Sequence, residues 1–217
     1  MPLKAAVIPV TDLQQNCTLL WCSETNKGVV IDPGGDVPAI LEAVKEIGIT
    51  IEKILLTHGH FDHVGGAMDL SEALQVPIVG PHQDDAFITS AVVSTGKMYG
   101  LDGGRDVEGN AWLNDGDQIT FGTITLTVAH TPGHTPGHVV FYDQDAKLAQ
   151  VGDVMFKGSV GRTDFPRGDF DTLVASITQK LWPLGDDIAF IPGHGPASTF
   201  GEERASNPYV GDAALKT

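Results

Sequence analysis

The sequence predicts a mixed α/β (α+β) fold in which one sheet packs on another and helices cover the outside. Three observations support this prediction. Short apolar runs rich in β-branched residues recur along the chain and outnumber the helical patterns. The first half of the chain combines strands with a helix much as the second half does. The chain has 217 residues, 41% of them hydrophobic, which suits a single domain over residues 1–217.

Ten runs have the length and composition of strands. They span residues 5–10, 18–22, 29–32, 54–57, 78–80, 119–121, 124–129, 139–142, 148–151 and 188–192.

Two stretches carry apolar residues at helical spacing instead. The first begins near Asp36 and Pro38 and ends at Gly48, and the second begins behind Asp169. Their apolar faces are Ile40, Leu41, Val44 and Ile47, and Phe170, Leu173, Val174, Ile177 and Leu181. Segment 97–110 is rich in glycine and charge, which favours a long connection over a mobile flap, and the tail after Phe200 predicts a short helix or strap with a frayed end.

The charge balance excludes several classes of partner. Lys and Arg number 13 against 28 Asp and Glu, a formal net charge of −15. A surface that negative repels phosphate backbones and anionic headgroups, so we expect neither nucleic acid nor a membrane as partner. Two cysteines are too few for a disulfide framework. The N-terminus lacks a signal-peptide core, and no apolar run approaches the ~20 residues that span a bilayer, so we expect a cytoplasmic protein. We also expect a monomer or a small homo-oligomer.

Residues 55–66 read LLTHGHFDHVGG and concentrate side chains that bind metals. His58 and His60 lie two apart on an extended segment and can converge on one ion, while the following turn carries Asp62 and His63 towards a neighbouring position. A lone histidine is usually structural, but four ligand-type side chains at one turn favour a two-metal site.

Three further segments combine a ligand-type residue with glycine at a strand end. They are HTPGHTPGH with His134, QVGDVMF with Asp153 and FIPGHGP with His194. With the first cluster they give the ordered pattern that resembles the metallo-β-lactamase superfamily, whose fold is a four-layer αββα sandwich. The resemblance covers nearly the whole chain.

The resemblance implies a role for each ligand position. His58, His60 and His134 are expected at a first metal and Asp62, His63 and His194 at a second, with Asp153 bridging the two. Such ligands suit two divalent ions, with Zn²⁺ the first choice and Fe or Mn acceptable to the same set. Two residues have two interpretations each: His138 either orients a ligand from outside the metal shell or is an ordinary buried strand histidine, and Asp32 either orients a ligand or serves the Asp-Pro-Gly turn. His82 and His130 are left as structural or surface residues.

Within the superfamily, the chain most resembles the glyoxalase II branch, hydroxyacylglutathione hydrolase, in its short single-domain bacterial form. THGHFDHVGG, HTPGHTPGHV, GDVMFKGSVGRTDFPRGD and IPGHGP carry this resemblance. It implies hydrolysis of S-D-lactoylglutathione, a step of methylglyoxal detoxification, by a hydroxide that bridges the metals, with Asp62 and Asp153 as catalytic residues. The sequence shows no general acid beside the ligands, which favours a thiolate leaving group, whose conjugate thiol has a pKa near ~8.5.

The basic residues after Asp153 favour a small anionic thioester as substrate. Lys157 and Arg162 lie in a stretch with three of the 13 basic residues, and Arg162 matches a basic glutathione-binding position of the longer relatives. Two tyrosines of those relatives are replaced, one by Asp164 and one at Gly195-Pro196. Only 23 residues (217 − 194) follow His194, so we expect no C-terminal helical glutathione-binding domain.

Other readings of the ligand pattern stay open. A persulfide dioxygenase would hold one iron on His58, His134 and Asp153. A lactonase or another metallo-hydrolase of the superfamily would share all the ligands. A scaffold without turnover ranks last, because all seven ligand positions are filled.

Overall fold

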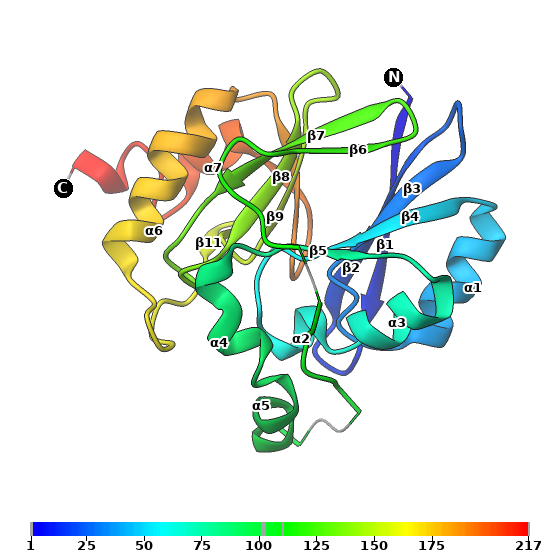
Figure 1. Cartoon of the computed structure of the whole chain (residues 1–217). Coiled ribbons are helices and arrows are strands. Elements are labelled where there is room, and N and C mark those ends of the chain that lie inside the picture. The colour runs from blue at the N-terminus through cyan, green and yellow to red at the C-terminus, as the bar shows by residue number, and fades with distance from the viewer. Residues whose placement is uncertain (1, 101–102, 110, 217) are drawn as a thin grey trace.

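The computed structural model describes residues 2–100, 103–109 and 111–216 (Figure 1). Its first sheet contains five strands in the order β1-β2-β3-β4-β5. They are β1 (Leu3–Val10), β2 (Gln15–Cys22), β3 (Lys27–Ile31), β4 (Thr50–Leu55) and β5 (Ile78–Val79). The β1-β2-β3 part is antiparallel, whereas β3, β4 and β5 run parallel.

The second sheet contains six strands in the order β13-β12-β9-β8-β7-β6. They are β6 (Gln118–Phe121), β7 (Ile124–His130), β8 (Val139–Asp143), β9 (Leu148–Gly152), β12 (Ala189–Pro192) and β13 (Ser198–Thr199). Only the β12-β9 pair is parallel among these described strands. A separate hairpin joins β10 (Met155–Phe156) to β11 (Ser159–Val160).

The helices are short and lie outside the sheets. They are α1 (Val37–Ile47), α2 (Phe61–Val64), α3 (Ala67–Leu74), α4 (Ala86–Thr89), α5 (Val92–Met98), α6 (Phe170–Ser176) and α7 (Phe200–Ser206). A π-helical turn over Ile177–Leu181 extends α6, and 3₁₀ turns cover Gln83–Asp85, Trp182–Leu184 and Ala214–Lys216. Asp169 caps α6 by accepting the Thr172 N–H at 2.7 Å, and α1 ends at Gly48 in the left-handed conformation.

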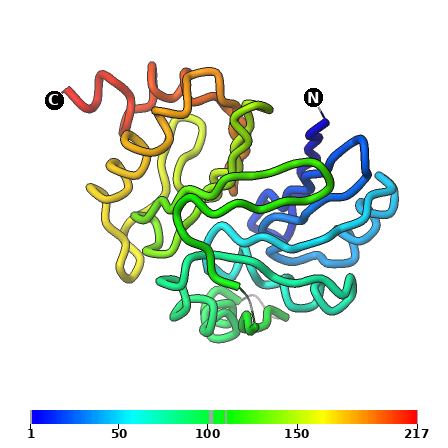
Figure 2. Tube along the Cα trace, turned by 45° about the horizontal axis from the view of Figure 1, so that its top comes forward, coloured from blue at the N-terminus to red at the C-terminus, as the bar shows by residue number. Residues whose placement is uncertain are grey.

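The apolar residues divide into three buried layers because successive strand residues point to opposite faces. Leu20 and Leu55 pack between the sheets, whereas Leu19 and Ile54 pack on the outer face of the first sheet with α1 and α3. A third cluster fills the space between the second sheet and α6 and α7. These layers form an αββα sandwich, with the first sheet and the second on opposite sides of the molecule (Figures 1 and 2).

The predicted elements are all present, with local differences. The strand predicted at 54–57 begins earlier, at Thr50, and ends at Leu55, because the chain turns there towards the histidine cluster. In the predicted connection 97–110, α5 extends through Met98, residues 99–100 and 103–109 lack helix and strand, and 101–102 and 110 lie outside the described residues. The tail forms α7 and is not frayed directly after it, because Asn207 and Val210 are buried. No helix among the described residues is both long and apolar enough to cross a membrane.

Candidate metal centre

The ligand-type residues come from five segments that meet at one edge of the sandwich. His58 and His60 follow β4, Asp62 and His63 lie on α2, His134 follows β7, Asp153 follows β9 and His194 follows β12. The two sheets are joined here, because the Asn16 N–H at the start of β2 donates to the Gly193 carbonyl at 2.7 Å. Strand ends from both sheets therefore deliver their side chains to one place.

Three histidines form the first group of ligand atoms. His60 Nδ1 lies 3.1 Å from His58 Nε2 and 3.0 Å from His134 Nε2. Two ligands with bonds of ~2.1 Å at a tetrahedral angle are about 3.4 Å apart, so these three nitrogens are spaced like ligands of one ion.

Asp62, His63 and His194 form the second group. Asp62 Oδ2 lies 3.2 Å from His194 Nε2 and 3.8 Å from His63 Nε2. The three ligand atoms lie within 4.8 Å of one another, which is compatible with a second ion.

Asp153 lies between the two groups. Its Oδ1 is 3.3 Å from His63 Nε2, while its Oδ2 is 3.8 Å from His134 Nε2 and 3.9 Å from His194 Nε2. One carboxylate thus faces both groups, as a bridging ligand does.

Hydrogen bonds behind the histidines select the nitrogen that faces the site. The Thr57 hydroxyl donates to Asp32 at 2.6 Å and accepts from His58 Nδ1 at 3.0 Å, and His63 Nδ1 donates to the same carboxylate at 2.9 Å. His134 Nδ1 donates to the Arg162 carbonyl at 2.7 Å. Each Nδ1 therefore carries the proton, which leaves the Nε2 lone pair of all three rings for a metal.

His138 holds the backbone of the bridging residue. Its Nε2 accepts the Asp153 N–H at 3.1 Å, and its ring stacks on His58 with centroids 4.8 Å apart. It lies behind the ligands, as Asp32 does, and orients Asp153 through the main chain.

The electrostatics of the site suit cations. Burial lowers the pKa of His58 and His134, so both imidazoles are neutral at pH 7 and free to act as ligands. Burial disfavours the charged form of His63, but the carboxylates of Asp153 and Asp62 outweigh it and raise the pKa of this ring. The raised pKa means that His63 holds a proton between the carboxylates of Asp153 and Asp62. A bound cation would replace that proton.

Unpaired atoms at the centre give a test of metal fit. His63 Nε2 and Asp153 Oδ1 are buried and lie 3.3 Å apart, and neither has another hydrogen-bond partner among the described residues. Buried polar atoms are normally paired, so these two call for a ligand that the protein does not supply. The donor set of imidazoles and carboxylates is the one that Zn²⁺ and Fe bind.

Asp85 is a buried residue of the site that the sequence does not reveal. Its carboxylate accepts the Gly59 N–H at 2.9 Å, the Thr135 hydroxyl at 2.8 Å and the Gly137 N–H at 2.6 Å. It thus ties the segment between His58 and His60 to the loop that carries His134. In HQDDAF nothing distinguishes Asp85 from its exposed neighbour Asp84, because the contacts come from residues far away in the sequence.

We expect Asp85→Asn to loosen the first ligand group. Asparagine is uncharged and its amide nitrogen cannot accept, so all three donors lose a charged partner and at least one loses its acceptor, which costs about 1.5–3 kcal/mol of the free energy of unfolding. Metal affinity should fall roughly 10–100-fold, as for other contacts behind the ligands. Thermal unfolding and metal titration measure both effects against the exposed Asp145→Asn. An affinity equal to that of the control would contradict the clamp.

Arg162 and Lys157 lie at different distances from the ligand groups. The Arg162 guanidinium stacks 4.6 Å from the centroid of Phe165, whose ring packs against His60 at 4.8 Å. Asp164 accepts two hydrogen bonds from that guanidinium, of 2.9 and 2.7 Å. Lys157 instead faces Glu202 at 3.9 Å, on the exposed surface.

A cleft of about 690 Å³ opens beside Asp62. Three pairs of glycines line it, from the turn before α1, from the end of α2 and from the 103–109 segment. Its charged lining residues among those described are all acidic: Asp12, Asp36, Asp62 and Asp69. Asp62 is the only one of the seven ligand-type residues in its described lining, and the cleft contains no described cation that could bind an anion.

Comparisons with known proteins agree with this architecture. Hydroxyacylglutathione hydrolase GloC of Haemophilus influenzae is 42% identical over 205 residues, which cover 94% of this chain and 96% of that protein. The crystal structure of BLEG-1 B3 metallo-beta-lactamase superposes with a TM-score of 0.88 at 34% identity, over 95% of this chain and 99% of that one. TTHA1623 in a di-iron-bound form superposes with a TM-score of 0.86 at 36% identity, over 94% and 99%.

The family model reaches from the end of β1 to the last ligand position. It is described as the metallo-beta-lactamase superfamily and matches residues 10–194, which contain all seven predicted ligands. The family match covers the ligand groups, and the structural match covers the αββα sandwich. The chain belongs to the metallo-beta-lactamase superfamily.

Proposed function

We propose that this metallo-hydrolase is a glyoxalase II-like thioesterase. It cleaves S-D-lactoylglutathione or a related acyl thioester to a carboxylic acid and a free thiol. The observation that carries the proposal is the pair of ligand groups joined by Asp153. The name and 42% identity of the GloC relative support the thioester class.

The ligand groups would hold two divalent ions, with His58, His60 and His134 at one, Asp62, His63 and His194 at the other, and Asp153 at both. Zn²⁺ is our first choice, and the di-iron form of TTHA1623 supports Fe as an alternative. When bound, such a pair of ions lowers the pKa of an attacking water and stabilises negative charge on the substrate oxygen.

The protein's own residues orient the reaction. The Asp62 carboxylate lies within the second ligand group, 3.2 Å from His194 Nε2, so it is placed to orient the attacking water and accept its proton. Both cysteines are buried in apolar clusters and cannot serve as nucleophiles. A departing thiolate needs no acid, because its pKa of ~8.5 is close to ambient pH.

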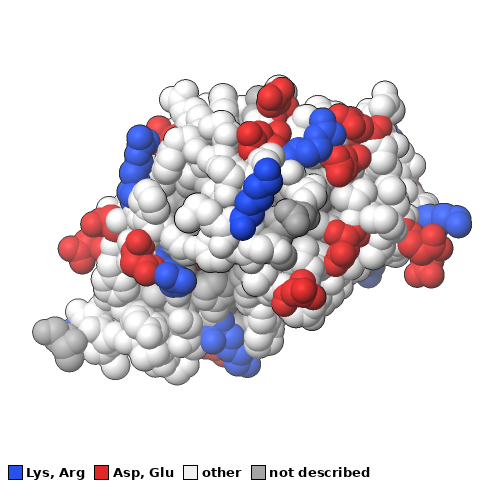
Figure 3. Space-filling model, turned by 90° about the horizontal axis from the view of Figure 1, so that it is seen from below, with Lys and Arg blue, Asp and Glu red and all other residues white. Residues whose placement is uncertain are grey.

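The charges around the site favour weak selectivity for the thiol carrier of the substrate. We place the acyl group at the ligand groups, because the described lining of the cleft beside Asp62 contains no Lys or Arg to hold an anionic carrier. Arg162, across Phe165 from the histidines, is the nearby cation we assign to an anionic substrate. On the face in Figure 3, the described basic side chains are scattered among acidic ones, which supports a small molecule over nucleic acid.

We expect Arg162→Ala to raise KM about tenfold with little change in kcat, because a removed ground-state contact weakens binding and transition state alike. Steady-state kinetics with S-D-lactoylglutathione measure this split. The matched control is Arg204→Ala, since Arg204 forms similar exposed ion pairs with Asp186 and Asp212. An unchanged KM for Arg162→Ala would remove Arg162 from the pocket and leave the metal site untouched.

Two rival activities remain, persulfide oxidation and β-lactam hydrolysis, and both can be tested on the protein preparation used for the thioester assay. A single-iron persulfide dioxygenase would use only His58, His134 and Asp153, whereas the second group is gathered beside the first. The similarity to BLEG-1 B3 metallo-beta-lactamase favours including a β-lactam substrate.

The deciding experiment measures hydrolysis of S-D-lactoylglutathione, of an acyl thioester without glutathione and of a β-lactam, on protein whose metals have been counted. We expect two ions per chain, thioester hydrolysis and its loss on chelation. Two ions with equal turnover of both thioesters would show a broader thioesterase. One iron with no hydrolysis would overturn the proposal.

A further inference from the structure

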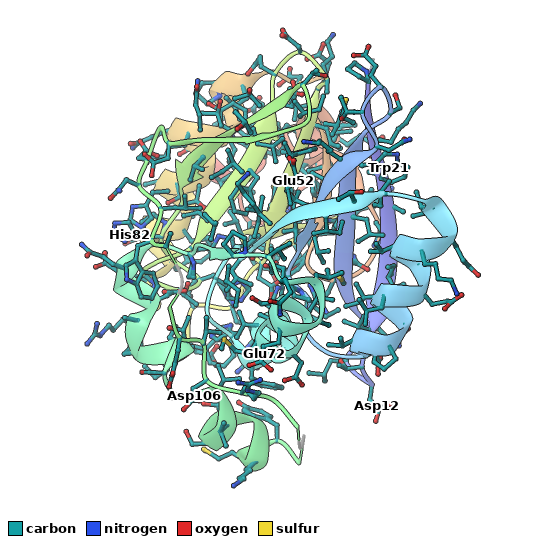
Figure 4. The ribbon with its side chains drawn as sticks, turned by 45° about the vertical axis from the view of Figure 1, so that its right-hand side comes forward. Asp12, Trp21, Glu52, Glu72, His82 and Asp106 are labelled. Carbon is teal, nitrogen blue, oxygen red and sulfur yellow. The ribbon has the colours of Figure 1, made fainter. Side chains whose placement is uncertain are left out.

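A second cluster of metal-binding side chains lies outside the main site. His82, Asp84 and His130 each offer a ligand atom, and these three atoms lie within 4.8 Å of one another. His82 follows β5 and His130 ends β7, so the fold brings together residues 48 positions apart (130 − 82). Figure 4 shows His82 at the edge of the molecule.

The contacts within this cluster have the spacing of ligands. His82 Nδ1 lies 3.3 Å from Asp84 Oδ2, close to the ~3.4 Å expected for two ligands of one tetrahedral ion. The same nitrogen accepts the Asp84 backbone N–H at 3.2 Å, a bond that an ion would replace. The rings of His82 and His130 are stacked with centroids 4.2 Å apart, which keeps their ring nitrogens close together.

His130 presents an unprotonated nitrogen to this cluster. Its Nε2 donates to the Pro136 carbonyl at 2.9 Å, which leaves the lone pair on Nδ1. Burial lowers its pKa, so the ring is neutral at pH 7. The only nearby cation among its described neighbours, Lys180, is itself paired with Asp115 at 2.7 Å.

The cluster is open enough to exchange an ion with solvent. The His82 side chain is 15% exposed and that of Asp84 is 53% exposed. Water can therefore complete the coordination shell, as it does at metal sites with three protein ligands.

From this arrangement we infer that His82, Asp84 and His130 form a third transition-metal site, weaker than the main pair and suited to Zn²⁺ or Cu²⁺. Its ion would brace the loop that carries His134. His82 N–H donates to the Gly137 carbonyl at 3.0 Å, and the neighbouring Asp85 binds Gly137 from the other side. This inference does not depend on the thioesterase proposal, because its site shares no ligand with the main centre.

The test is Zn²⁺ titration by calorimetry of protein that already holds its two tightly bound ions. We expect one further equivalent to bind and to raise the melting temperature, because a ligand of the folded state stabilises it. His82→Gln and Asp84→Asn should weaken this equivalent at least tenfold while metal analysis still finds the first two ions. Asp145→Asn, exposed on another loop, is the control and should behave as wild type.

A Cu²⁺ titration followed by electron paramagnetic resonance identifies the ligands directly. We expect nitrogen hyperfine splitting from two imidazoles, reduced to one in His82→Gln. Because His130 also holds the Pro136 carbonyl, the test relies on His82 and Asp84, and circular dichroism checks that both variants fold. A third equivalent that is missing from the wild type, or retained in both variants, would overturn the inference.

Discussion

Asp153→Ala is expected to abolish hydrolysis and metal loading together. Its carboxylate is the only one that faces both ligand groups among the described residues, at 3.3 Å from His63 and 3.8 Å from His134. Its removal deprives both ions of a ligand, so kcat/KM should fall by more than the roughly 100-fold that contacts behind the ligands cost. Metal analysis and thioester kinetics on one preparation measure the two losses.

Two further variants test whether the loss comes from the charge of Asp153 or from a general effect of removing a carboxylate. Asp153→Asn keeps the shape of the side chain and removes its charge, so it should also lose the second ion if the carboxylate bridges. Asp145→Ala, on the exposed surface, should leave metal content and activity unchanged, and circular dichroism should show all three folded. Activity at the wild-type level in Asp153→Ala would refute the mechanism, and two retained ions would refute the bridge.

The fold and the gathering of the ligand-type residues at one edge are predictable because they depend on short-range patterns. Period-2 alternation assigns Leu19 and Leu20 to opposite faces of β2, and this alternation alone separates the outer layer from the layer between the sheets. The ligand motifs follow strand ends, where glycine permits the turn. The two-residue strands β10 and β13 are not predicted, because they are too short for any period.

The supporting residues are not predictable in this way. Asp85 and Asp84 are identical in type and adjacent, yet only Asp85 reaches across 50 residues to Thr135. His82 and His130 look like unrelated surface residues until β5 and β7 place them in contact. The pairing of Arg162 with Asp164 is local, but its position over Phe165 and so beside His60 depends on the loop geometry. Such contacts arise from tertiary packing, which leaves no periodic trace in the sequence.

Gly193 shows how closely the backbone approaches the proposed ions. A Cβ at this position would lie 2.1 Å from Asp153 Oδ1 and 2.5 Å from His63 Cε1. The backbone cannot retreat, because the Gly193 N–H donates to Gly152 at 2.8 Å and its carbonyl accepts from Asn16 at 2.7 Å. His63 cannot yield easily either, since Asp32 holds its other nitrogen at 2.9 Å.

Gly193→Ala should therefore displace the Asp153 carboxylate and eliminate metal binding and hydrolysis, although position 193 contributes no ligand. Overpacking should also lower the free energy of unfolding by about 1–3 kcal/mol. Gly195→Ala is a matched control: its φ of 75° imposes a backbone cost of roughly 1–2 kcal/mol, but nothing lies within 4 Å of the new Cβ. Both variants should be destabilised to a similar extent, and only Gly195→Ala should keep its ions and its activity. Equal metal content in the two would mean that the carboxylate can move aside and still bridge.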